Sequence, residues 1–322
     1  MTKPFVVPVQ PDSVCRPPSS SEFLVDRTFR ALARIGVIFI LVLLAALVFE
    51  IGSKAIPGMQ KHGLAFITGT VWDVNQQKFG ILPAIWGTLY SAVIALLIGG
   101  FFGVSMAIFL TQDFLPPRIS AVFRTIVELL AAIPSVVYGL WGIYVVIPAI
   151  RPLTDWLGKA LGWIPFFGST LSGPGLLPAA LVLAIMILPT IAAVSQDALR
   201  SVPLKTKQAA YGMGTTHWEA ILQVIVPAAA TGIFGALVLG LGRALGETMA
   251  LAMLVGNSNQ ISLSLFSPAN TLAALLALNF PEAGANEIEV LMYAALILML
   301  ITLAVNVAGS MIMAISQRGS KK

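Results

Sequence analysis

Two charged residues interrupt an otherwise apolar segment. Arg243 and Glu247 are flanked by residues 228–242 and 248–255, which carry no charge. Because a charge at the centre of a bilayer costs about 2.5 to 3.5 kcal/mol on insertion scales, charges in such a place usually serve a function. Their spacing places both residues on one face of one predicted helix. Arg243 can offer a planar fork of donors to an oxyanion, and Glu247 can hold that fork or accept a proton. The alternative is an interhelical salt bridge near the membrane edge.

A second group of residues suggests contact with a partner protein. In the segment 205–227, Ala209 and Ala210 begin a short predicted helix, Gly214 permits a turn, and a second helix follows. We predict that Pro227 interrupts this second helix at the membrane. Small residues allow close approach, so the segment can form an exposed knob for a groove in another subunit. The alternative is a connector lying on the bilayer surface.

Pro134 lies in another apolar stretch and predicts a kinked or broken helix, because proline lacks the N–H that an interior helical position needs. A break leaves backbone groups free to line a cavity, and broken spans are where many transporters bind ions. The alternative is a packing kink whose free backbone groups are satisfied by neighbouring helices.

Several kinds of chemistry are missing from the sequence. It has no phosphate-binding G-x-x-x-x-G-K-[ST] loop, so the chain is not expected to hydrolyse ATP. The two histidines, His62 and His217, are predicted on opposite sides of the membrane, and the one cysteine, Cys15, lies in a polar tail, so no metal site is expected. We therefore expect neither an enzyme nor a bound cofactor.

The composition identifies the elements that must position these residues. With 57% hydrophobic and 10% charged residues, the 322-residue chain is predicted to be a polytopic membrane protein. Uncharged runs between successive charges locate six spans and therefore an all-α fold. The apolar stretch 271–280 is too short to cross, and we interpret it as re-entrant or interfacial. The predicted spans are residues 31–52, 80–110, 124–150, 176–196, 228–256 and 289–315.

Polar segments flank this predicted transmembrane domain of residues 31–316. Residues 1–30 are predicted to be a disordered tail, residues 197–227 form a loop, and residues 317–322 form a second tail. Six spans place both ends on one side, where most of the 19 Lys and Arg residues also lie, so both termini are predicted to be cytoplasmic. The same bias accounts for the net charge of +5, and no nucleic acid is required.

The segment 205–227 resembles the E-A-A-x3-G-x9-I-x-L-P loop of importer-type ABC transporter permeases. Ala209, Ala210 and Gly214 are in register with that motif, whereas Gln208 replaces its Glu. In that family the loop is the coupling helix, which inserts into a groove of the ATPase subunit. The resemblance implies that these four residues contact an ATPase.

Residues 129–142 and 242–250 resemble the C-type (PstC) permease family of phosphate-specific ABC importers. This resemblance implies a type I ABC importer permease fold in a bacterial inner membrane, with charges essential for transport at Arg243 and Glu247. It also implies three partners: an A-type phosphate permease subunit that completes a heterodimer, nucleotide-binding ATPase subunits that carry ATP and magnesium, and a periplasmic phosphate-binding protein.

The expected function is that of a non-catalytic permease subunit of an ATP-driven phosphate importer. Two alternatives are open: a permease for another oxyanion such as sulfate, and an autonomous anion channel or secondary transporter that uses the same intramembrane charges. Copurification of an ATPase through the segment 205–227 separates the importer from the channel.

Overall fold

The computed structural model describes residues 20–112 and 114–319 of the chain. It divides into two units, residues 1–53 and 54–322, which we describe separately. Within the described residues, six helical segments are long and apolar enough to cross a membrane, the number that the sequence predicts. They are Phe23–His62, Leu82–Thr111, Ser135–Leu161, Leu176–Arg200, His217–Leu245 and Ala285–Ala314.

The described part of the first unit is helix α1 (Ser20–His62), which continues into the second unit. The disordered tail predicted over residues 1–30 is therefore too long: α1 begins at Ser20, and the residues before it lie outside those that the structure describes. An ion pair one helical turn apart, with 2.5 Å between Arg30 Nη2 and Asp26 Oδ2, supports the helix near its beginning.

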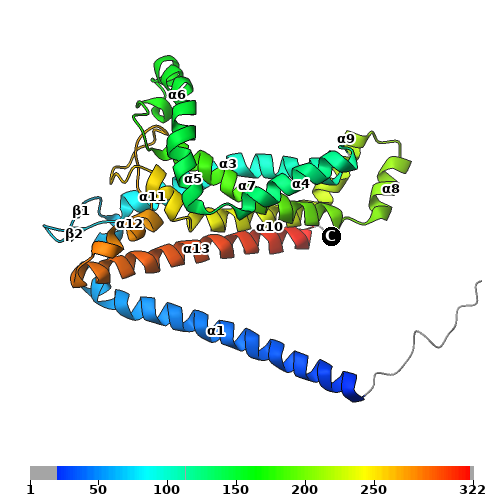
Figure 1. Ribbon diagram of the computed structural model, residues 1–322, viewed down its shortest axis with the longest axis horizontal. Coiled ribbons are helices and arrows are strands. Elements are labelled where there is room, and N and C mark those ends of the chain that lie inside the picture. The colour runs from blue at the N-terminus through cyan, green and yellow to red at the C-terminus, as the bar shows by residue number, and fades with distance from the viewer. Residues whose placement is uncertain (1–19, 113, 320–322) are drawn as a thin grey trace, which may run out of the picture. The chain divides into compact units, whose positions relative to one another are not determined.

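Helix α7 (Leu176–Arg200) is the central helix of the second unit. It packs against α3 (Leu82–Thr111) and against α10 (Val226–Leu245), and α10 also packs against α13 (Ala285–Gly319). Figure 1 shows these helices running side by side. The core of the unit follows α7, whose side chains Leu183, Ile187 and Ile191 are fully buried.

Glycines allow α3 and α7 to approach closely. A Cβ atom on Gly99 would lie 2.7 Å from the carbonyl oxygen of Ala184, and one on Gly103 would lie 3.0 Å from the Cβ of Ile191. Small residues at such positions are typical of helices that associate within a membrane, because they let two backbones come into contact.

The third predicted span is divided into two helical segments at Pro134. The first is α4 (Pro117–Ala132), and the second runs through α5 (Ser135–Trp141), a π-helical turn η2 (Gly142–Val146) and α6 (Ile147–Leu161). The residue before a proline is disfavoured in the helical conformation, and Ile133 is indeed extended. The candidate span begins at Ser135, later than predicted, and α6 turns steeply away from the long helices (Figure 1).

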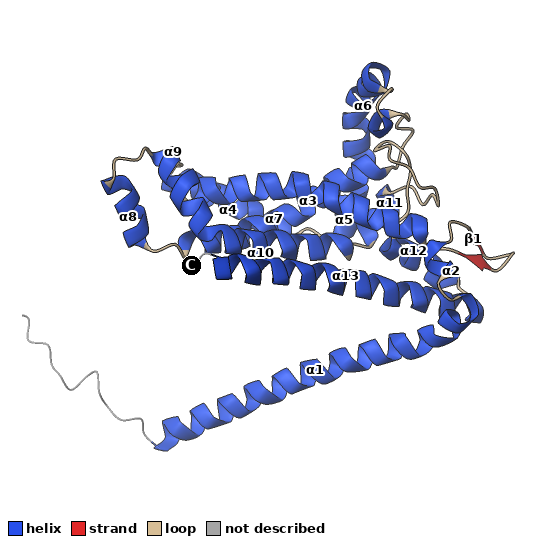
Figure 2. Cartoon of the chain, turned by 180° about the vertical axis from the view of Figure 1, so that it is seen from behind, coloured by secondary structure: helices blue, strands red, loops and turns tan. Residues whose placement is uncertain are grey.

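The end of the second unit that contains α12 (Leu272–Asn279) has a core of its own. The Phe66 ring stacks on that of Tyr293 with 4.7 Å between centroids, and Leu272 and Leu275 are buried in the same cluster. With 8 residues, α12 is too short to cross a membrane, which agrees with the prediction for this stretch. The smaller elements are α2 (Ala65–Thr68), the antiparallel strands β1 (Trp72–Asp73) and β2 (Lys78–Phe79), η3 (Pro165–Phe167) and η5 (Phe280–Glu282) (Figure 2).

Candidate functional site

Arg243 and Glu247 do not share one helical face, because α10 ends at Leu245. Glu247 lies in the break that follows, and a separate helix, α11 (Met249–Leu254), begins after it. The prediction of one continuous span through residue 256 is therefore wrong. The two charged residues belong to different elements, so each is positioned by its own contacts.

Polar groups satisfy the backbone that this break exposes. The Glu247 carboxylate accepts a hydrogen bond of 3.3 Å from the N–H of Ala250, and the Thr248 hydroxyl donates one of 3.2 Å to the carbonyl of Gly246. These bonds replace part of the helical hydrogen bonding that ends at the break. Glu247 is thus a structural acceptor as well as a charge.

Arg243 is held by a hydrogen bond between two helices. Its Nη1 donates to the Thr190 Oγ1 on α7 at 3.2 Å, and the side chain is otherwise exposed. Within residues 20–112 and 114–319, Arg243 forms no ion pair with Glu247 or with any other carboxylate. The interhelical salt bridge that we considered as the alternative is therefore not formed there, and the other guanidinium donors are available to an anion.

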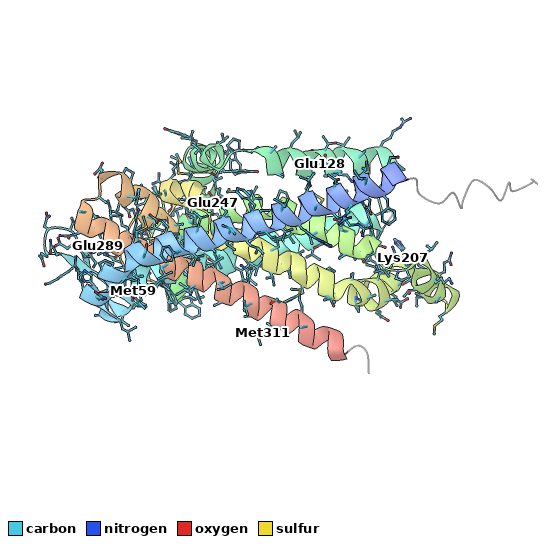
Figure 3. All side chains as sticks on the ribbon, turned by 90° about the horizontal axis from the view of Figure 1, so that it is seen from below. Met59, Glu128, Lys207, Glu247, Glu289 and Met311 are labelled. Carbon is cyan, nitrogen blue, oxygen red and sulfur yellow. The ribbon has the colours of Figure 1, made fainter. Side chains whose placement is uncertain are left out.

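Asn306 of α13 lies against Gly242, the residue before this arginine. A Cβ atom on Gly242 would lie 3.0 Å from the Asn306 Oδ1, so the glycine makes room for the amide. Figure 3 shows Glu247 between Glu289, at the end of the unit with α12, and Lys207, at the end with helix α8 (Leu204–Gly212). The polar groups of this region are thus part-way along the helices.

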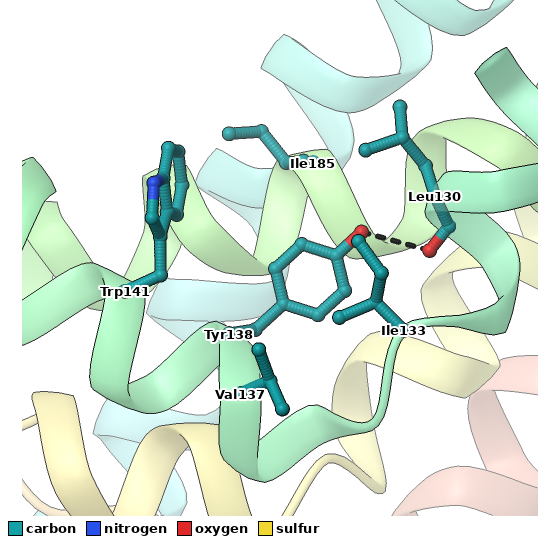
Figure 4. A pocket seen from close by; sticks show the side chains of 6 residues that line it. All are labelled: Leu130, Ile133, Val137, Tyr138, Trp141 and Ile185. Atoms are coloured by element: carbon teal, nitrogen blue, oxygen red, sulfur yellow. Dashed lines mark hydrogen bonds between the residues drawn. The ribbon is translucent and has the colours of Figure 1, made fainter.

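The break at Pro134 adjoins an apolar cavity of about 270 Å³ (Figure 4). The Tyr138 hydroxyl at its wall donates a 2.8 Å hydrogen bond to the carbonyl of Leu130. In an unbroken helix that carbonyl would accept from the residue four positions later, which here is a proline without an N–H. Helix α5 also packs against α11, since a Cβ atom on Gly139 would lie 3.4 Å from the Cα of Ala250, so this break is close to the one that follows α10. The cavity is lined by Leu130, Ile133, Val137, Tyr138, Trp141 and Ile185.

The segment 205–227 folds as two helices joined by a turn. After α8 (Leu204–Gly212), Gly214 adopts a φ of +86°, which favours glycine as expected for a turn. Thr216 then begins α9 (His217–Glu219): its backbone N–H and its hydroxyl both donate to the Glu219 carboxylate, at 2.8 and 2.7 Å. The Glu219 N–H donates in return to the Thr216 hydroxyl at 3.4 Å, and this reciprocal cap fixes the start of the second helix.

Pro227 does not interrupt that second helix. Helix α9 continues through a π-helical turn, η4 (Ala220–Ile225), into α10, so the helical segment is unbroken from His217 to Leu245. The wider π turn precedes the proline, whose ring would crowd a carbonyl of the preceding turn in a regular α-helix. The interruption predicted at Pro227 is therefore wrong.

The four residues assigned to ATPase contact by resemblance differ in exposure. Gln208, Ala209 and Gly214 are exposed, whereas Ala210 is buried. A Cβ atom on Gly214 would meet no atom within 4 Å, and the adjacent Met213 is 87% exposed. Figure 2 shows α8 at the opposite end of the second unit from α12.

Phe114, in the connection between α3 and α4, joins this loop to the rest of the unit. Its ring centroid lies 4.8 Å from that of His217, 4.7 Å from that of Trp218 and 5.2 Å from that of Phe109. We call these four rings the aromatic cluster. Sequence reasoning missed Phe114 and Thr190, because contacts between distant segments leave no local pattern. His62 packs on Phe79 with 5.6 Å between ring centroids, in a separate group from His217.

Comparison with known proteins gives consistent similarities. Residues 99–322 match the family described as binding-protein-dependent transport system inner membrane component. The phosphate transport system permease protein PstC of Haemophilus influenzae is 41% identical over 86% of this chain and 90% of its own. The protein of the same name from Mesorhizobium japonicum is 39% identical over 92% of this chain and 92% of its own. The one from Pasteurella multocida is 38% identical over 93% of this chain and 95% of its own.

Solved structures of ABC transporters share the fold. A chain of a bacterial ABC transporter involved in the import of alginate matches with a TM-score of 0.58 at 16% identity, over 91% of this chain and 99% of that chain. A chain of the MetNI methionine ABC transporter in an inward-facing conformation matches with a TM-score of 0.56 at 19% identity, over 73% of this chain and 95% of that one. At these identities the likeness is one of fold.

Proposed function

Since the chain belongs to the family of binding-protein-dependent transport system inner membrane components, and within it to the phosphate transport permeases of the PstC type, we propose that it is the transmembrane permease subunit of an ATP-driven phosphate importer. The observation that carries this proposal is the 41% identity over 86% of the chain to the Haemophilus influenzae permease. In this role the chain forms half of the translocation pathway.

Arg243 is the residue that we propose to meet phosphate in the pathway. Thr190 uses one donor of its guanidinium, and the remaining donors can form a bidentate contact with two phosphate oxygens. Glu247 sits in the adjoining helix break, where the freed backbone is a feature of ion sites in many transporters. Its carboxylate can accept a proton from phosphate, which fully ionised sulfate does not carry.

The exposed surface of α8 and Gly214 is the proposed contact with the ATPase. Gln208 and Ala209 are exposed there, and small residues let a partner approach closely. The helix that begins at His217 continues without interruption past Arg243. A displacement at the ATPase contact can therefore be transmitted along one helix to the arginine. This arrangement supports an importer rather than an autonomous channel or secondary transporter.

The remaining partners follow from the same proposal. An A-type permease subunit completes the pathway as a heterodimer, a periplasmic phosphate-binding protein delivers phosphate, and ATP with magnesium is bound and hydrolysed by the ATPase subunits. We propose no catalytic role and no cofactor for this chain. We also propose that it lies in the bacterial inner membrane with both termini and the segment 205–227 in the cytoplasm.

Reconstitution in liposomes tests the function. With the three partners present, the chain should support ATP-dependent accumulation of radiolabelled phosphate, and a tenfold excess of sulfate should not compete. A catalytically inactive ATPase partner is the control. Phosphate flux without ATP would identify a channel or secondary transporter, and equal competition by sulfate would identify a general oxyanion permease.

The orientation has its own test. In a Cys15→Ser background, Thr215→Cys and Ser172→Cys should react with a membrane-impermeant maleimide from opposite faces of sealed vesicles. Labelling of both from one face would refute the proposed topology.

A further inference from the structure

Two neighbouring cavities lie between α3 and α4, near the connection that joins these helices. One has a volume of about 290 Å³ and the other of about 570 Å³, and Phe109 and Leu115 line both. The cavities therefore adjoin at these two residues, and we call them together the α3–α4 groove. The smaller cavity is lined by Phe109, Leu110, Leu115, Pro117, Ser120, Ala121 and Arg124, and the larger by Phe101, Phe102, Ser105, Met106, Phe109, Leu115, Phe123 and Leu188.

One end of the groove is polar and positively charged. Arg124 and Ser120 are one helical turn apart on α4, and both line the smaller cavity. In the part of the chain that the structure describes, Arg124 forms no ion pair. Glu128 is one turn further along α4 but lines neither cavity. The positive charge is therefore not neutralised by a carboxylate in the groove.

The other end of the groove is apolar. The side chains of Phe101 and Phe102 are 68% and 56% exposed, and Phe123 on the facing helix is 39% exposed. In a membrane-spanning protein such side chains are covered by lipid or by another subunit rather than by water. From Phe109 to Phe102, α3 rises about 10 Å at 1.5 Å per residue, which is about two-thirds of the roughly 15 Å of hydrocarbon in one leaflet.

We propose that the α3–α4 groove binds one anionic phospholipid. Its phosphate accepts hydrogen bonds from the Arg124 guanidinium and the Ser120 hydroxyl, and an acyl chain lies along Phe102, Met106 and Phe123. Charge complementarity selects this occupant, because basic pockets between membrane helices suit anionic head groups, and only an amphiphile fills both ends. A free phosphate ion would occupy the polar end alone. This inference does not depend on which substrate the transporter carries.

Fluorescence quenching by brominated lipids tests the proposal on the assembled transporter. A tryptophan introduced as Phe123→Trp reports contact with acyl chains, and its signal is taken as the difference from the parent complex in lipid nanodiscs. Brominated phosphatidylglycerol in a phosphatidylcholine host should quench this tryptophan at about fivefold lower mole fraction than brominated phosphatidylcholine does, since one basic residue near an anionic head group contributes about 1 kcal/mol. Phe102→Trp provides a second reporter if Phe123→Trp does not assemble.

Two substitutions on α4 test whether the positive charge of Arg124 selects the anionic lipid. Arg124→Gln should abolish the preference for phosphatidylglycerol, whereas Arg118→Gln, which removes an exposed arginine that does not line the groove, should retain it. Millimolar inorganic phosphate should leave the quenching unchanged. Equal quenching by both lipids, equal losses in both variants, or displacement of the lipid by inorganic phosphate would overturn the proposal. Absence of quenching by either lipid would also overturn it and would indicate that a neighbouring subunit fills the groove.

Discussion

The Tyr138 hydroxyl donates a 2.8 Å hydrogen bond to the Leu130 carbonyl, across the helix break that Pro134 creates. One side chain thus supplies the donor that the proline lacks. Because Tyr138 is also buried, it fixes the beginning of α5 to the end of α4 and shapes the cavity between them.

Tyr138→Phe should therefore destabilise the assembled transporter. The Leu130 carbonyl keeps a second, longer bond of 3.4 Å from the N–H of Ile133, so the expected loss is about 1 kcal/mol, the usual net value of one hydrogen bond. Thermal unfolding in detergent measures the change. Tyr144→Phe, at a side chain that is 75% exposed, is the control and should unfold like the parent. Identical midpoints for both variants would show that the bond contributes nothing.

Two substitutions separate the charge of Glu247 from its role as an acceptor. Glu247→Gln keeps an oxygen for the N–H of Ala250 and removes the charge, whereas Glu247→Leu removes both. We expect Glu247→Gln to assemble normally but to transport phosphate poorly or to discriminate less against sulfate. Glu247→Leu should also lower the thermal midpoint, because the N–H of Ala250 at the helix break loses its hydrogen-bond acceptor. Normal uptake and selectivity in Glu247→Gln would assign the residue to structure alone.

Two substitutions of Arg243 test its proposed bidentate contact with phosphate. Arg243→Lys keeps the charge but cannot form two parallel hydrogen bonds to an oxyanion, so it should assemble and transport poorly, and Arg243→Ala should transport least. Initial rates of ATP-dependent phosphate uptake provide the comparison. Uptake near the parent rate by an assembled Arg243→Ala complex would show that transport does not need a positively charged side chain at this position.

Thr190 should act through Arg243 as a positioning residue. Thr190→Val has nearly the same shape but cannot accept the 3.2 Å bond, so kcat/KM for phosphate should fall about fivefold, which is about 1 kcal/mol for one hydrogen bond. In an Arg243→Ala background the same change should have little further effect. Thr302→Val, at a hydroxyl bonded only to the Leu298 carbonyl of its own helix, is the control. Equal losses in both Arg243 backgrounds would contradict the assignment.

Gly214 should resist substitution because of its backbone. Its φ of +86° disfavours residues with a β-carbon by about 1 to 2 kcal/mol. Steric crowding is not the cause, because a Cβ atom built on Gly214 would meet no atom within 4 Å. ATP-dependent uptake should therefore decrease in the order Gly214→Asn, Gly214→Ala, Gly214→Val, since asparagine tolerates this conformation best. Gly212→Ala, at the last residue of α8 with open space around it, should be close to the parent. Parent-like uptake by Gly214→Val would identify the loop as a simple linker.

The aromatic cluster should couple the loop to α3. Phe114→Ala removes three ring contacts, each typically worth about 0.5 to 1.5 kcal/mol, and two of them hold α9 to the α3–α4 connection. We expect ATP hydrolysis to continue while fewer phosphate ions enter per ATP consumed. Phe280→Ala, at the opposite end of the unit, is the control. An unchanged ratio of phosphate to ATP would show that the cluster is only packing.

Local patterns predicted the features that depend on single residues or short runs. Gaps between charges located six spans, Pro134 marked the end of α4, and Gly214 marked a turn with positive φ, because each follows from a property of the residue itself. They also indicated a segment near residue 275 that is too short to cross. These features account for the number of spans and for the form of the loop.

The errors concern contacts and helical geometry that sequence spacing does not contain. Arg243 and Glu247 are four residues apart, but hydrogen bonds from neighbouring polar groups stabilise a break between them. Pro227 was expected to interrupt a helix, yet a π turn accommodates it. The bond from Arg243 to Thr190 joins residues 53 positions apart, and no periodicity connects such a pair.

The π turn η4 has a further consequence for the arginine. Each residue of an α-helix rotates the next side chain by about 100° around the axis, so a turn that holds extra residues changes the azimuth of everything beyond it. Arg243 lies on the same continuous helix as Trp218, on the far side of that turn. The π turn therefore sets the angle around the helix axis between Trp218 near one end of this helix and Arg243 near the other. A regular α-helix with the same number of residues in place of this turn would rotate Arg243 away from Thr190 while the aromatic cluster stayed in place.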